Sequence, residues 1–76
     1  MKSVYQILLE IRPEADFQAS NDFVADGLLD SFDVVTLVSE LEENYGFSIT
    51  GTDILPENFH NIVAIDALLE RYGVHP

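Results

Sequence analysis

The chain has 76 residues, 47% of them apolar, and no cysteine; this predicts one small domain over residues 1–76 and excludes disulfides, thiolate metal sites and a disordered acidic tail. Fourteen acidic residues against three basic ones give a net charge of −11. A surface with this charge repels nucleic acid and anionic lipid and attracts basic protein patches, so we expect partners that are proteins, not nucleic acids.

The first predicted helix begins after Ser3, which forms a Ser-x-x-Gln capping-box pattern with Gln6. Its apolar residues have the i, i+3, i+4, i+7 spacing of a buried face: Val4, Ile7, Leu8 and Ile11. Pro13 predicts the helix end, because proline disfavours helical backbone at the preceding residue. The opening residues resemble no secretory signal and no apolar run approaches the roughly 20 residues of a membrane span, so we expect a cytoplasmic protein without membrane insertion.

A connection from about residue 13 to 29 follows, rich in Asp, Asn, Ser and Gly. A loop of this length is uncommon inside a compact domain and is usually functional. Its apolar residues are expected to fix it to the core: Phe17, Phe23, Val24 and Leu28.

The second predicted helix starts at Asp30 or Ser31 and runs to Tyr45, with Gly46 as its C-terminal stop. Its buried stripe comprises Val34, Leu37, Val38, Leu41 and Tyr45.

A short segment around Ile54 is expected to form a single helical turn that Pro56 interrupts, and the last helix runs from Asn61 to Gly73. The stretch at 46–50 alternates like a strand but has no partner strand. The predicted class is therefore all-α: a small four-helix bundle of three main helices and one short helix, with the long loop between the first and second.

Catalytic and metal sites are not expected. No Gly-x-Ser-x-Gly elbow is present, and residues 21–32 lack the acid spacing and terminal Glu of a calcium loop. A triad of Ser31, His60 and an aspartate is not excluded by the sequence, but so short a chain leaves little room for a substrate pocket.

The second helix has an unusual outward face. At about 100° per residue, Phe32 and Val35 fall outside the buried stripe. They predict a contact patch, unless Phe32 folds back against the long loop. Glu40, Glu42 and Glu43 lie in the C-terminal part of the helix, where the macrodipole disfavours negative charge. They indicate a docking face for basic partners, or alternatively a solvated face.

Ser31 is redundant as a helix cap, because Asp30 can accept the same backbone hydrogen bond. A helix N-terminus is also an anion site, where an Oγ atom can carry a phosphodiester. Nothing nearby in the sequence would activate the serine as a nucleophile. We therefore expect Ser31 to be an acceptor that another enzyme modifies.

The stretch "DSFDVVTLVSELEENYGFSI" resembles the Asp-Ser-Leu-x-x-x-x-Leu-Val-x-x-Leu-Glu-x-x-Phe-x-Ile signature of acyl carrier proteins. The resemblance implies that Ser31 receives 4′-phosphopantetheine from coenzyme A through a Mg²⁺-dependent phosphopantetheinyl transferase. The arm would carry acyl or aminoacyl thioesters between enzymes of fatty-acid, polyketide or related biosynthesis. It further implies a monomeric carrier that is not itself an enzyme.

In that family, residues beside the serine and acids of the second helix dock onto basic patches of the loading ligase and of downstream synthases. The resemblance carries this role to Asp30, Phe32, Asp33, Val35, Glu42 and Glu43.

The chain departs from fatty-acid carriers in ways that favour a dedicated, stand-alone carrier. Gly27 lies four residues before Ser31 instead of three, which looks more like D-alanyl carrier proteins. Thr36 stands where fatty-acid carriers usually have a glutamate. Ser39 stands where they often have a methionine. The alternative function is an acidic adaptor or inhibitor that acts by surface charge with an unmodified serine.

Overall fold

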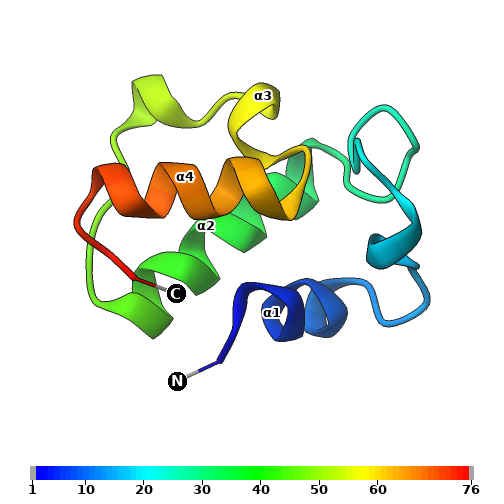
Figure 1. The fold of residues 1–76 in the computed structure, drawn as a ribbon, viewed down its shortest axis with the longest axis horizontal. Helices are drawn as coiled ribbons and strands as arrows, with labels where there is room; N and C mark the ends of the chain where they lie inside the picture. The colour runs from blue at the N-terminus through cyan, green and yellow to red at the C-terminus, as the bar shows by residue number, and fades with distance from the viewer. Residues whose placement is uncertain (1, 76) are drawn as a thin grey trace.

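The computed structural model describes residues 2–75, and over that range the chain forms four α-helices and two short 3₁₀ turns without a strand (Figure 1). The helices are α1 (Val4–Ile11), α2 (Ser31–Tyr45), α3 (Pro56–Phe59) and α4 (Ile62–Arg71). The predicted all-α class and helix order are confirmed. α1 packs against α2 and α4, and α3 packs against α4.

The termini of α1 are fixed by local and distant contacts. Ser3 Oγ accepts the Gln6 N–H, and the Gln6 side chain accepts the Ser3 N–H, which completes the predicted capping box. Near this end, the Tyr45 hydroxyl donates to the Lys2 carbonyl over 2.7 Å. At the other end Arg12 reaches Asp33, so α1 runs antiparallel to α2.

The bounds of α2 agree with the prediction. Asp30 is its N-cap, and it forms a capping box with Asp33 in which each carboxylate accepts the other residue's N–H. Gly46 ends the helix in the left-handed region at φ 69°, where it donates to the Glu42 carbonyl. A residue without Cβ adopts this conformation without steric cost.

The long connection between α1 and α2 is ordered. Phe17 and Phe23 are buried with their rings edge to face, 5.0 Å apart. The Asp22 carboxylate accepts the N–H groups of residues 24 and 25, and Gly27 closes the turn at φ 76°. Leu29 is fully buried, whereas Val24 is only half-buried and lies outside the core cluster. The prediction that Val24 anchors the loop is therefore wrong, and Leu29 takes that place.

The return segment differs from the prediction at Pro56, which begins α3 and does not interrupt a turn. Proline suits the first helical position, because its fixed φ is helical and its missing N–H would have had no partner there. A 3₁₀ turn precedes it at Gly51–Asp53.

A tyrosine clamp holds this segment against the end of α4. The Tyr72 hydroxyl donates to Asp53 Oδ2 over 2.6 Å and accepts the Thr50 N–H over 2.9 Å. The ring of Tyr72 also packs against that of Phe47, with centroids 5.5 Å apart. The clamp therefore ties the chain beyond α4 to the segment that leads into α3.

The core is wholly apolar within the described residues and is drawn from all four helices and the connection. Its most buried side chains include Leu8, Leu37, Leu41, Phe59 and Leu68. None of the helices in residues 2–75 has both the length and the apolar character needed to cross a membrane.

Candidate functional site

Ser31 is the first residue of α2, and its side chain is exposed. Asp30 is the N-cap, and its Oδ1 accepts the Asp33 N–H over 2.8 Å. Across residues 2–75, no hydrogen bond engages the Ser31 hydroxyl. The prediction that serine is redundant as a cap is confirmed, and its Oγ is accessible to another molecule.

An apolar pocket of about 290 Å³ opens beside Ser31. It lies between the long connection, the first turns of α2 and the segment before α3; its lining residues are Val24, Asp30, Ser31, Val34, Val35, Ile54 and Pro56. A group attached to Ser31 would begin at the wall of this pocket. No sequence pattern places Val24, Ile54 and Pro56 at the site, because these residues come together with Ser31 only in the folded chain.

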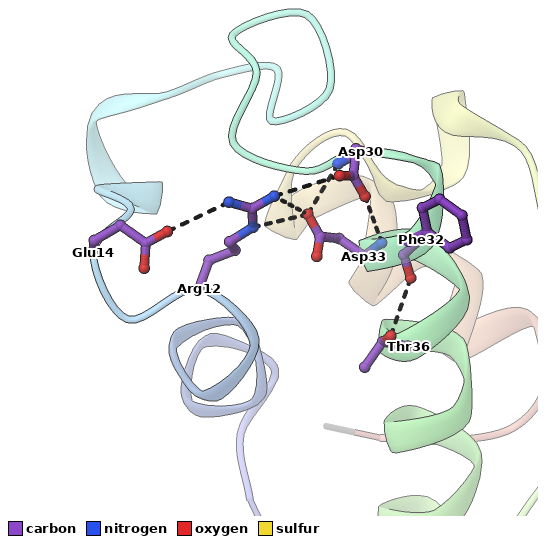
Figure 2. A network of polar contacts seen from close by, with 6 residues as sticks. All are labelled: Arg12, Glu14, Asp30, Phe32, Asp33 and Thr36. Carbon is purple, nitrogen blue, oxygen red and sulfur yellow. Dashed lines mark hydrogen bonds and ion pairs between the residues drawn. The ribbon is translucent and has the colours of Figure 1, made fainter.

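Arg12 organises the charges at the start of α2 (Figure 2). Its Nε donates to Asp33 Oδ2 over 2.9 Å, and its guanidinium lies 3.5 Å from carboxylate oxygens of Asp30 and Glu14. Desolvation raises the pKa of Asp33, but the bonds from Arg12 and Asp30 and the charge of Arg12 outweigh it and hold that pKa below its ordinary value. No local sequence pattern assigns Arg12 a role; its only signal in the sequence is that it is the last Lys or Arg before residue 71.

The predicted outward face of α2 is confirmed near Ser31. Phe32 is 82% exposed and Val35 is 61% exposed, so Phe32 does not fold back against the loop. Residues three and four apart share one helix face, which places Phe32, Val35 and Thr36 together. The Thr36 hydroxyl donates to the Phe32 carbonyl over 3.0 Å, within the helix (Figure 2).

The glutamates at the other end of α2 have separate environments. Glu42 is half-buried, and its Oε2 accepts the Ile49 N–H over 2.7 Å. Glu42 therefore has a local partner at the end of α2 where the macrodipole disfavours its charge, and it is not part of a fully solvated face. The backbone carbonyl of Glu40 accepts the Asn44 side-chain amide over 2.8 Å, whereas Glu43 is exposed.

The predicted partner-binding residues thus form two groups. Asp30, Phe32, Asp33 and Val35 surround Ser31, and Glu42 and Glu43 lie about three turns further along α2. At about 1.5 Å per residue, Ser31 and Glu43 are about 18 Å apart along the helix axis.

A triad between Ser31 and His60 is not formed. His60 lines a second pocket with Asp22 and Glu57, and no hydrogen bond within the described part of the chain joins it to Ser31. Its carbonyl instead accepts the Phe23 N–H over 2.6 Å, which ties the long connection to the end of α3.

Comparison with known protein families gives a match. A family model described as "phosphopantetheine attachment site" matches residues 3–69, which is most of the chain and includes the whole pocket beside Ser31. No curated protein and no solved structure matches.

Proposed function

The chain belongs to the phosphopantetheine attachment site family, and from this premise we propose that Ser31 is the residue that bears its 4′-phosphopantetheine. Carrier domains of this family work with a phosphopantetheinyl transferase and with partner enzymes. The observation that carries the proposal is that Ser31 is exposed at the first position of α2, while Asp30 and not Ser31 caps the helix.

The residues around Ser31 fit such an attachment. Its Oγ would form a bond to phosphorus of coenzyme A while the phosphoanhydride bond breaks, adenosine 3′,5′-bisphosphate leaves and the serine proton passes to the transferase. The N-terminus of α2 favours the resulting phosphodiester charge. When bound, the arm supplies a thiol that carries acyl or aminoacyl groups as thioesters, which this cysteine-free chain cannot supply itself.

We further propose that α2 contacts the partner enzymes and that the chain catalyses no turnover alone. The exposure of Phe32 and Val35 supports a contact beside the serine, and exposed Glu43 supports a second contact with a basic group. The position of Gly27 and the neutral residues Thr36 and Ser39 support a carrier dedicated to one ligase, as in aminoacyl or D-alanyl transfer, over general fatty-acid synthesis.

Mass spectrometry after incubation with coenzyme A, Mg²⁺ and a promiscuous transferase tests the attachment residue. We expect one phosphopantetheine on the wild type, none on Ser31→Ala, and an unchanged adduct on Ser39→Ala, which removes another exposed hydroxyl of α2. An adduct on Ser31→Ala would reassign the site. A wild type that never accepts the group would favour the acidic adaptor.

A further inference from the structure

The two acids next to Ser31 share one positive partner within the chain. The guanidinium of Arg12 reaches Asp33 at 2.9 Å and Asp30 at 3.5 Å. The Asp33 side chain is only 16% exposed, because it faces Arg12 and α1 and not the solvent. A partner that approaches Ser31 therefore meets a carboxylate pair whose negative charge is partly compensated, mainly at Asp33.

The exposed face of α2 has a different character. Following the helix from its N-terminus, the residues that share this face and are exposed are Phe32, Val35, Thr36, Ser39 and Glu43. The first four are uncharged, so the only full charge on this face is that of Glu43. The face is apolar beside Ser31 and acidic only at its far end.

Resting on the proposed function, we propose that Arg12 is a specificity-determining residue that masks Asp33, and partly Asp30, from partner enzymes. Partners then contact the surface beside Ser31 through an apolar patch that accepts Phe32 and Val35. Charge attraction acts about 18 Å away, between Glu43 and a basic side chain of the partner. Arg12 touches neither the attached group nor the partner; it acts through the two aspartates.

The masking has a measurable consequence in the salt dependence of partner reactions. Attraction between exposed charges is screened by salt, and charges at the edge of an interface change mainly the association rate and its salt sensitivity. Loss of Arg12 would leave the charges of Asp30 and Asp33 without a positive partner beside Ser31 and add a salt-sensitive attraction to basic partners. Because Arg12 is a partly exposed surface residue, its ion pairs contribute little to stability and the variant should fold.

The test measures kcat/KM for phosphopantetheine attachment from low to high sodium chloride, with the carrier as the varied substrate. Arg12→Gln is compared with Arg71→Gln, which removes one positive charge at the end of α4, where Arg71 contacts Asn58 at 3.4 Å. We expect Arg12→Gln to react several-fold faster than the wild type at low salt and to show a steeper salt dependence than Arg71→Gln. The double variant Arg12→Gln/Asp33→Asn, which has the wild-type net charge, should regain the wild-type slope.

Equal salt slopes for Arg12→Gln and Arg71→Gln would overturn the masking role while leaving the proposed function intact. Absence of an adduct on the wild type would overturn the proposed function, and this inference with it. Circular dichroism and urea unfolding establish that each variant is folded; if Arg12→Gln is not, Arg12→Met keeps the aliphatic length of the side chain and takes its place in the same comparison.

Discussion

Arg12 Nε donates a 2.9 Å hydrogen bond to Asp33 Oδ2, although 21 positions separate the two residues in the chain. The same carboxylate oxygen accepts the Asp30 N–H, so one atom both closes the capping box of α2 and holds the end of α1. The start of α2, where Ser31 lies, is thus positioned by α1 as well as by its own cap.

The pKa of Asp33 lies below its ordinary value, so we expect this carboxylate to contribute to acid unfolding. Its stabilisation is present above the unfolded pKa of about 3.9 and is lost as the pH falls from there through the lower folded pKa. Asp33→Asn keeps an oxygen acceptor for the cap. Its free energy of unfolding, measured in urea from pH 6 to pH 2, should therefore fall less with acid than that of the wild type. If the free energy of unfolding of Asp33→Asn fell as steeply with acid as that of the wild type, this prediction would be wrong.

Gly46 and Gly51 offer a matched pair for backbone strain. Gly46 has φ 69°, whereas Gly51 does not have a positive φ, and a Cβ at either position would meet nothing within 4 Å. Gly46→Ala should lower the free energy of unfolding by about 1–2 kcal/mol, because only its backbone conformation is unfavourable for alanine. Gly51→Ala should be neutral or stabilising. Similar urea midpoints for both variants would show that α2 can end without the left-handed residue.

Glu42 and Glu43 are adjacent acids with different expected roles: substitution of Glu42 should lower stability, and substitution of Glu43 should weaken partner turnover. Glu42→Ala removes the acceptor of the Ile49 N–H and should cost about 1–3 kcal/mol of stability. Glu43→Lys should change the urea midpoint little, since the side chain is exposed, but it should weaken turnover with a basic partner enzyme. Normal loading and transfer kinetics for Glu43→Lys would remove Glu43 from the docking face.

Salt should stabilise the fold. The net charge is −11, and residues 13–70 contain no Lys or Arg, so repulsion among their acids opposes the compact state. We expect the Tm to rise with sodium chloride, and to rise at millimolar Mg²⁺ as well, because counterions screen this repulsion. A Tm that is unchanged or lower in salt would show that local ion pairs outweigh the net charge.

Local patterns predicted most of the helix bounds. The capping residues Ser3, Asp30 and Asn61 and the stop at Gly46 each act through neighbours three or four residues away, so the sequence alone contains the relevant geometry. The role of Pro56 was harder to predict from the sequence, because proline can either end a helix or begin one. Which of the two occurs depends on how the chain packs after the turn.

The site was predictable where it depends on one helix and not where it depends on several. The exposure of Phe32 and Val35 follows from helical periodicity. The pairing of Arg12 with Asp33 and the hydrogen bond from Ile49 to Glu42 require segments that meet only after folding. No spacing rule connects such residues.

The clamp made by Tyr72 also bears on how far this carrier can be trimmed or transplanted. The family model ends at residue 69, yet the Tyr72 hydroxyl holds Asp53 and Thr50, next to Ile54 in the wall of the Ser31 pocket. Lys2, whose carbonyl accepts the hydrogen bond from the Tyr45 hydroxyl, likewise lies before the matched segment. A chain cut to residues 3–69 would retain Ser31 but lose both tethers. The transferable unit of this protein is therefore longer than the segment that identifies its family.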